Sequence, residues 1–341
     1  MPNYLSRIES WFTRFWHESS MRVLLLSPLA LLFLVIVTLR RKAYDLNLIK
    51  VIHLPVPVIV IGNITVGGTG KTPLILWLVT FLAKKGIHVG VVSRGYGRRS
   101  HGLISVNSEM SAENCGDEPW LIHQNTGCPV VVGANRVAAA NRLLELDPDV
   151  QVILSDDGLQ HYRLGRDVEV LVVDGERRFG NNLLLPAGPL REPASRISSV
   201  DAVVVNGKKA YLLHEQTYCM QLEGDLFYNL LLPEHKVNVL GFKGKSLHAV
   251  AGIGNPQRFF RTLTEKGLCV IPHAFPDHYD YKVEDFEQFE GEIIMTEKDA
   301  VKCRGFADER YWVFPVQARI STAFGQFILN KIKVPHGSKT H

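Results

Sequence analysis

The sequence has few cysteines, little net charge and no strong compositional bias. Its five cysteines are spread over 341 residues without a C-x-x-C pair or interleaved histidines, which argues against a disulfide scaffold and against a zinc site. The formal net charge of +4, from 38 Lys+Arg against 34 Asp+Glu, is too small to indicate a nucleic-acid partner. Hydrophobic residues at 46% and charged residues at 21% are typical of a globular protein and exclude a disordered or many-pass membrane chain.

One long apolar run stands near the amino terminus. Residues 23–39 carry no charge and lie between basic residues, which indicates a membrane segment. Because the run is shorter than the ~20 residues of a spanning helix and contains Pro28, a spanning and a half-inserted segment are both consistent with it. The residues before it predict an amphipathic helix at a membrane interface, with a helix packed on the protein's own core as the alternative. Its apolar face consists of Tyr4, Leu5, Ile8, Trp11, Phe12, Phe15 and Trp16.

From residue 56 onward, short β-branched runs alternate with helical stretches such as 72–85 and 134–146. Continuous apolar strands of this kind are buried on both faces, and helices between them predict a doubly wound, largely parallel α/β sheet. Ligands then bind at the carboxyl ends of the strands. The expected strands are 56–62, 88–93, 129–132, 150–157, 168–174 and 201–205.

The first of these strands runs into a glycine-rich turn. Residues 62–73 are GNITVGGTGKTP, in which glycines let backbone N–H groups surround phosphate oxygens, Lys71 neutralises phosphate charge and Thr72 can bind Mg²⁺. The usual P-loop pattern has glycine where this chain has Thr65. The turn therefore predicts a variant P-loop of an NTPase-like domain, with the phosphate-binding set Gly67, Gly68, Thr69, Gly70, Lys71 and Thr72.

A pair of carboxylates ends a later buried strand. Asp156 and Asp157 repel each other, so a nearby cation explains their pairing, although a solvated turn is the alternative. We expect Mg²⁺ to be held by Thr72, Asp156 and Asp157.

The loop after the last strand of this domain bears on the choice of base. Its sequence, Asn206 to Lys209, lacks the aspartate of the Asn-Lys-x-Asp loop with which GTPases commonly bind guanine. An adenine nucleotide is therefore favoured.

Three loops carry candidates for the chemistry of phosphoryl transfer, which needs a positioned acceptor and a proton acceptor. Asp117 opens a helix, as a functional carboxylate or as an N-cap. The Gly- and Pro-rich loop 180–192 ends in Arg191 and Glu192, as substrate contacts or surface charges. His278 lies in a polar loop, where a histidine is usually only solvated.

The last third repeats the α/β pattern and predicts a smaller second domain. We expect strands at 248–253, 269–275, 292–300 and 311–316, with helices at 256–266 and from Val283. The expected organisation is a membrane-associated helical segment at 1–45, a P-loop ATP-binding domain at 46–215, a linker at 216–236 and a C-terminal α/β domain at 237–341.

Eight short motifs in order resemble one family. Behind the apolar amino terminus stand GNITVGGTGKTP, SRGYGR (93–98), GDEP (116–119), ANR (134–136), SDDGLQH (155–161), LPAGPLRE (185–192), FPDHY (275–279) and TEKDAVK (296–302). This order is similar to that of the tetraacyldisaccharide 4'-kinases of lipid A biosynthesis, over about residues 56–302.

The resemblance implies transfer of the ATP γ-phosphate to the 4'-hydroxyl of a tetraacyldisaccharide 1-phosphate, giving lipid IVA, at the cytoplasmic face of the bacterial inner membrane. It implies ATP and Mg²⁺, a lipid substrate and a membrane, and no nucleic acid or protein partner. Asp117 is then the proton acceptor and His278 raises its basicity, whereas the TEKDAVK segment receives no role. The implied substrate-side set is Asn63, Glu118, Arg136, Arg191 and Glu192.

Two other functions suit parts of the sequence. A membrane-recruited P-loop ATPase switch fits the loop and the amphipathic segment, but such switches usually carry a lysine where Val66 stands. A P-loop kinase or ligase with a soluble acceptor leaves the membrane segment unexplained. Neither alternative accounts for the domain that carries His278.

Overall fold

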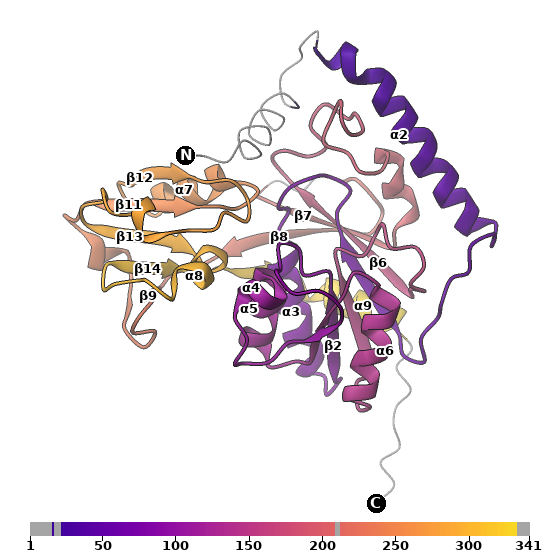
Figure 1. The fold of residues 1–341 in the computed structure, drawn as a ribbon, viewed down its shortest axis with the longest axis horizontal. Coiled ribbons are helices and arrows are strands. Elements are labelled where there is room, and N and C mark those ends of the chain that lie inside the picture. Colours follow the sequence, from indigo (N-terminus) through magenta and orange to yellow (C-terminus); the bar gives the residue numbers. More distant parts are fainter. Residues whose placement is uncertain (1–15, 17–21, 209–211, 333–341) are drawn as a thin grey trace, which may run out of the picture.

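The computed structural model describes residue 16, residues 22–208 and residues 212–332, which form two α/β domains and one long helix (Figure 1). The amphipathic helix expected over residues 4–16 lies outside the described residues except for Trp16. This side chain is buried, and its indole Nε1 donates a hydrogen bond of 3.0 Å to the Pro186 carbonyl. At this one position the segment contacts the protein's own loop.

A nine-stranded sheet forms the larger domain, in the order β15-β8-β7-β6-β1-β5-β2-β4-β3. The strands from β8 to β4 are mutually parallel, and the edge strands β15 and β3 are antiparallel to their neighbours. Runs of Val and Ile make the central strands fully buried, as strands covered on both faces require. The bounds are β1 Val58–Gly62, β2 Val89–Ser93, β3 Ile104–Ser105, β4 Val130–Val132, β5 Val152–Asp156, β6 Val168–Asp174, β7 Ala202–Asn206, β8 Thr217–Glu223 and β15 Gln317–Ile320.

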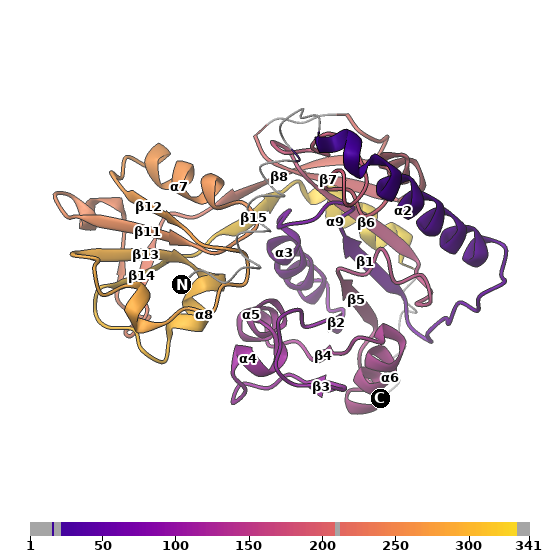
Figure 2. The same ribbon diagram turned by 45° about the horizontal axis from the view of Figure 1, so that its top comes forward.

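Helices cover both faces of this sheet, which confirms the doubly wound architecture (Figure 2). One face packs against Leu74, Trp120 and Phe324, and the other against Val137 and Leu143. The first face is covered by α3 Lys71–Ala83, α5 Asp117–Thr126 and α9 Thr322–Lys331, and the second by α6 Arg136–Leu146 and the 3₁₀ turn Ala194–Ser199, with α4 Ala112–Cys115 preceding α5.

The smaller domain has its own six-stranded sheet, in the order β10-β9-β14-β13-β11-β12. Apolar side chains of α7 pack on one face, and those around Phe286 and Cys303 pack on the other. The bounds are β9 Phe227–Asn229, β10 Lys236–Val237, β11 Leu247–Ala251, α7 Pro256–Glu265, β12 Ile271–Ala274, β13 Glu292–Thr296, α8 Glu297–Cys303 and β14 Tyr311–Phe314, with 3₁₀ turns at Val239–Phe242 and Val283–Asp285.

The chain crosses between the two domains twice, and this differs from the expected division at 216–236 and 237–341. β8 and β15 both belong to the large sheet and pair with each other, Leu222 opposite Ala318. The smaller domain is therefore an insertion between two adjacent strands, and α9 returns to the core of the larger domain. The expected linker instead contains β8 and β9.

Two elements of the smaller domain also differ from expectation. The helix expected from Val283 is a single 3₁₀ turn that ends at Asp285. The strand expected over 292–300 ends at Thr296, because the Thr296 side chain accepts a hydrogen bond from the Asp299 N–H and caps α8.

The apolar run near the amino terminus forms α2, Arg22–Asp45, which lies on the far side of the larger domain from the smaller one (Figure 1). Phe33 and Leu34 pack on the core, while the opposite face of α2 is exposed and apolar. Among the described residues, no helix has the length and apolar character that crossing a membrane requires. The exposed face consists of Leu25, Leu29, Leu31, Leu32, Val35, Ile36 and Leu39.

Candidate active site

The glycine-rich turn joins β1 to α3 and is shaped for close approach of backbone to phosphate. Gly67 and Gly70 have left-handed φ values of 93° and 95°, which side-chain-bearing residues rarely adopt. A Cβ on Gly70 would also lie 2.3 Å from the amide nitrogen of Asn206, which donates a hydrogen bond of 2.9 Å to the Thr69 carbonyl. The turn therefore presents the amino end of α3 at the carboxyl edge of the sheet, as expected for a P-loop.

Lys71, the first residue of α3, lies among carboxylates. Its ammonium is 3.3 Å from Asp157 Oδ1 and donates a weak hydrogen bond of 3.4 Å to Asn63 Oδ1. Burial alone would lower the pKa of Lys71, but the carboxylates of Asp157, Glu118 and Asp156 outweigh it and raise the pKa. Lys71 is therefore charged and positioned beside the phosphate turn.

The two carboxylates that follow β5 have opposite electrostatic environments. Burial and the nearby carboxylates of Glu118 and Asp157 raise the pKa of Asp156 to about 7, although Ser93 Oγ donates a hydrogen bond of 2.9 Å to Asp156 Oδ2. Asp157 is also buried, but the Lys71 ammonium and the Arg191 guanidinium lower its pKa to about 2. The pair thus combines one fixed anion with one carboxylate that binds a proton near neutrality.

The residues here fit a magnesium ion. Asp156 Oδ1 and Thr69 Oγ1 are buried with no hydrogen-bond partner within the described part of the chain, and a cation with its water ligands would complete such groups. The described residues contain no cluster of three or more His, Cys, Asp or Glu side chains suited to a metal. Mg²⁺ in nucleotide sites usually takes only one or two carboxylates with phosphate and water.

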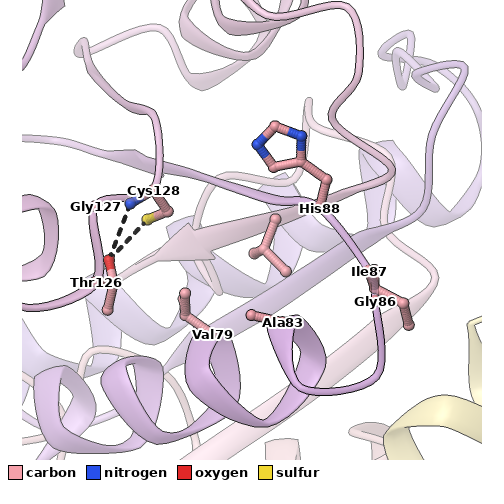
Figure 3. Close-up of a pocket in the computed structure, with 9 residues that line it drawn as sticks. Val79, Ala83, Gly86, Ile87, His88, Thr126, Gly127 and Cys128 are labelled. Atoms are coloured by element: carbon pink, nitrogen blue, oxygen red, sulfur yellow. Dashed lines mark hydrogen bonds between the residues drawn. The ribbon is translucent and has the colours of Figure 1, made fainter.

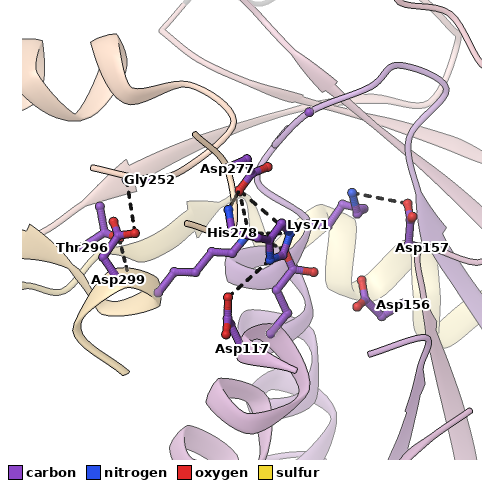
Figure 4. A network of polar contacts seen from close by, with 12 residues as sticks. Lys71, Asp117, Asp156, Asp157, Gly252, Asp277, His278, Thr296 and Asp299 are labelled. Carbon is purple, nitrogen blue, oxygen red and sulfur yellow. Dashed lines mark hydrogen bonds and ion pairs between the residues drawn. The ribbon is translucent and has the colours of Figure 1, made fainter. Parts of the chain in front are cut away.

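Asp117 and His278 meet across the two domains (Figure 4). His278 Nδ1 lies 3.3 Å from Asp117 Oδ2, and the Lys302 ammonium lies 3.1 Å from the same oxygen. The helix-cap alternative for Asp117 is wrong, because Gly116 is the N-cap of α5 and Asp117 is its first helical residue. Burial would raise the pKa of Asp117, but the hydrogen bond from His278 and the nearby lysines lower it. The expectation that His278 raises the basicity of Asp117 is therefore wrong in direction.

The residues expected on the substrate side mostly hold the site together. Glu192 is buried, accepts hydrogen bonds from Gln160 Nε2 at 2.6 Å and from the Tyr162 hydroxyl, and so has no free face. Arg136 is 3% exposed and donates to the Gly133 carbonyl at 2.7 Å beneath the Asp156 turn.

The other three residues of that set each have a polar partner. The Asn63 side-chain amide donates to the Gly67 carbonyl at 3.1 Å. Arg191 Nη1 lies 3.0 Å from Asp157 Oδ2, and Glu118 Oε1 lies 3.2 Å from the Lys298 ammonium. Because Arg191 is one-third exposed, it retains a solvent-accessible part.

Comparisons with known proteins show which family the chain resembles. The sequence model of the family described as tetraacyldisaccharide-1-P 4'-kinase matches residues 22–333. The chain belongs to this family. It is 47% identical over 323 residues to a tetraacyldisaccharide 4'-kinase from Methylobacillus flagellatus, and this match covers 94% of this chain and 96% of the relative. It is 49% identical over 313 residues to a tetraacyldisaccharide 4'-kinase from Shewanella sediminis, and this match covers 91% of each chain. A crystal structure of LpxK from Aquifex aeolicus in complex with ATP matches with a TM-score of 0.74 and 30% identity, over 92% of this chain and 100% of that one.

In this family member, the smaller domain touches the P-loop directly. Arg177, which follows β6, donates through Nη1 to the Gly254 carbonyl at 2.6 Å and through Nη2 to the Gly68 carbonyl. Buried Asp174 holds Arg177 at 3.1 Å and Arg258 of the smaller domain at 2.6 Å. These contacts place the β11–α7 loop against the phosphate-binding turn.

Sequence reasoning missed several residues of the site. Lys298 and Asp277 contact His278, Lys302 contacts Asp117, and the centroid of the Tyr96 ring lies 4.9 Å from that of the His278 ring. The two lysines are four residues apart, a spacing that places both on one face of a helix. That signal was present in TEKDAVK, but nothing local indicated which partner the face contacts.

One hollow lies away from these groups (Figure 3). It has a volume of about 330 Å³ and shares no residue with the site just described. It lies at the amino end of β2, opposite the edge of the sheet that carries the P-loop. Its lining is Val79, Ala83, Gly86, Ile87, His88, Val89, Thr126, Gly127 and Cys128.

Proposed function

We propose that this chain transfers the terminal phosphate of ATP to the 4'-hydroxyl of a tetraacyldisaccharide 1-phosphate. The observation that carries the proposal is the P-loop lysine Lys71 on one side of the site and the Asp117–His278 pair on the other, in a chain of this kinase family (Figure 4). Phosphoryl transfer needs these two functions, charge neutralisation and a positioned acceptor, and little further chemistry from the protein.

The donor side is the work of the P-loop. The backbone N–H groups of residues 67–72 surround the phosphates, and Lys71 neutralises charge on the β- and γ-phosphates. Thr72, Asp156 and Asp157 would hold Mg²⁺, and the bound ion would supply neutralisation of the charge on the transferred phosphate. Arg191, bound to Asp157, has an accessible part that can contact the phosphates or the acceptor.

On the acceptor side, Asp117 receives the proton of the 4'-hydroxyl and His278 orients its carboxylate. The lowered pKa of Asp117 makes it a weak base in the resting enzyme. A weak base suffices because the transition state of phosphoryl transfer is loose, and the hydroxyl proton leaves late, when the oxygen has become strongly acidic.

The helix α2 brings the site to its lipid. A four-chain lipid acceptor remains in the bilayer, so the catalytic domain has to reach the membrane surface. The exposed apolar face of α2 lies on the cytoplasmic side of the bacterial inner membrane and inserts into the interface, while Phe33 and Leu34 couple the helix to the domain.

The test follows labelled phosphate from γ-labelled ATP into a tetraacyldisaccharide 1-phosphate in detergent micelles with Mg²⁺. Wild-type protein yields a labelled lipid with phosphate at the 4' position, and Lys71→Ala reduces the rate of labelling by at least ~10³-fold while the circular dichroism spectrum shows a retained fold. Hydrolysis of ATP without labelled lipid would instead support the ATPase switch. Full activity of Lys71→Ala would refute the P-loop assignment.

A further inference from the structure

Helix α8 carries the motif TEKDAVK, to which the proposed function assigns no role. It packs against α5 of the larger domain, and its lysines 298 and 302 stand four residues apart on the face toward that helix. Both ammonium groups are largely buried, with side-chain exposures of 16% and 10%. A buried lysine is rare without a specific set of partners.

The Lys298 ammonium contacts three groups at once. It lies 3.2 Å from Glu118 Oε1, 3.0 Å from Asp277 Oδ1 and 3.2 Å from His278 Nε2. Burial would lower the pKa of Lys298, but the Glu118 and Asp277 carboxylates raise it, so the group stays an ammonium with three N–H donors and no acceptor.

This geometry determines where the proton on His278 lies. A nitrogen 3.2 Å from an ammonium can only accept a hydrogen bond, so Nε2 carries the lone pair. The single proton of the neutral ring is then on Nδ1, which donates to Asp117 Oδ2 at 3.3 Å. The ring is further confined by Asp277 of its own loop and by Tyr96, and a protonated Nε2 would face the Lys298 charge directly.

Lys302 acts on the other partner of the pair. Its ammonium forms an ion pair of 3.1 Å with the same oxygen, Asp117 Oδ2, that accepts from His278. With both contacts on Oδ2, Oδ1 is the oxygen that remains for the substrate hydroxyl.

Hydrogen bonds of Asp299 hold the start of α8 in place. Asp299 is 0% exposed, and its carboxylate accepts hydrogen bonds from the Thr296 hydroxyl at 2.6 Å, the Gly252 N–H at 3.1 Å and the Tyr281 hydroxyl at 3.1 Å. These bonds fix the start of the helix to two other segments of the smaller domain. The lysines on either side of Asp299 are therefore held in place.

We propose that Lys298 and Lys302 are positioning residues: Lys298 keeps the lone pair of His278 on Nε2, so that Nδ1–H points at Asp117, and Lys302 turns Asp117 so that Oδ1 faces the acceptor hydroxyl. This rests on the proposed function in that Asp117 is the proton acceptor. The tautomer of His278 is measurable without any turnover.

The first experiment measures that tautomer by ¹⁵N NMR on full-length protein labelled at histidine, in detergent. The difference from His278→Gln assigns the signal among the 13 histidines. The wild type at pH 7.5 shows a protonated Nδ1 and an unprotonated Nε2. A protonated Nε2 in the wild type overturns the proposal. This result does not depend on the behaviour of the variants or on whether the chain is a kinase.

Lys298→Met then removes the charge that faces Nε2, and the ring loses its single tautomer. The matched control is Lys245→Met, which breaks an exposed ion pair with Glu292 in the same domain and leaves the His278 signal unchanged. Lys298→Arg retains a buried cation and the wild-type tautomer, so it serves if the methionine variant does not fold. A wild-type His278 signal in folded Lys298→Met would refute the role of Lys298.

Kinetics separate positioning from general damage. We expect Lys298→Met to lower kcat by on the order of 10²-fold with little change in KM for ATP. Because Lys302 lowers the pKa of Asp117, Lys302→Met raises that pKa and moves the acidic limb of the kcat/KM profile to higher pH. An unmoved limb in an active Lys302→Met enzyme would refute its role, whereas absence of lipid phosphorylation by the wild type would refute the proposed function alone.

Discussion

Replacing Gly254 with alanine should separate the smaller domain from the P-loop. A Cβ on Gly254 would lie 2.0 Å from the Gly68 nitrogen, and real Cβ contacts are essentially never shorter than 3.0 Å, so the two backbones have to part by about 1 Å. The P-loop is held within the larger domain by β1, by α3 and by Asn63, whereas the smaller domain is joined to it by two chain segments and by polar contacts such as Asp174–Arg258. We therefore expect the smaller domain to move.

The cost of this shift follows from the position of His278. A displacement of about 1 Å at a reacting centre lowers the rate by ~10²-fold, or ~2.7 kcal/mol in activation free energy. Since Gly254 and His278 belong to the same domain, the shift reaches the Asp117–His278 contact. kcat for lipid phosphorylation should fall by about this factor, whereas the Kd for MgATP should change less than ~3-fold.

The assay compares Gly254→Ala with Gly305→Ala, measuring kcat by label transfer and Kd by calorimetry. Gly305 has no heavy atom within 4 Å of its Cβ position and no left-handed φ, so alanine there is tolerated and leaves both values unchanged. Wild-type kcat in Gly254→Ala would refute the contact. A rise in Kd as large as the fall in kcat would show that the P-loop moved instead.

Three further predictions address the pair, the metal and the membrane. Asp117→Ala and His278→Ala should each lower kcat strongly, and the double variant should lose far less than the product of the two effects; multiplicative losses would indicate independent roles. Because the pKa of Asp156 is raised to about 7, binding of Mg²⁺ should release a proton and should become tighter as the pH rises through 7. Calorimetry in buffers of different ionisation enthalpy measures this proton release, and Asp156→Asn should abolish it. Leu32→Glu on the exposed face of α2 should weaken vesicle binding but leave phosphorylation of a short-chain soluble acceptor unchanged. Leu240→Glu, at an exposed position of the smaller domain, should change neither. An equal loss of activity on the membrane lipid and on the soluble acceptor would show that α2 serves the catalytic domain.

The elements that sequence reasoning predicted well are those whose information is local. The β-branched runs became β1, β5 and β6, and the fold class is confirmed, because a buried strand and a glycine-rich turn are determined by neighbouring residues. The domain boundaries were not predictable from the sequence, since β8 pairs with β15, which lies nearly a hundred residues further along the chain. Neither strand has a sequence pattern that indicates which strand it pairs with.

The candidate site shows the same limit. Lys71 and Asp157 were both expected at the nucleotide site, Lys71 for phosphate and Asp157 for Mg²⁺, and the structure places their charged groups 3.3 Å apart. Lys298 was not expected at the Asp117–His278 pair, since its role depends on two helices from different domains packing face to face. The direction in which the pKa of Asp117 is shifted depends on the same contacts between the domains.

The placement of the smaller domain within the larger one affects the order in which the chain matures. On a ribosome, α2 and the P-loop emerge first, but the core beneath α3 also needs Ala318, Phe324 and Ile328. These residues follow the whole inserted domain, and domains form in order of synthesis. The nucleotide-binding domain is therefore begun before the inserted domain and completed only after that domain has been synthesised.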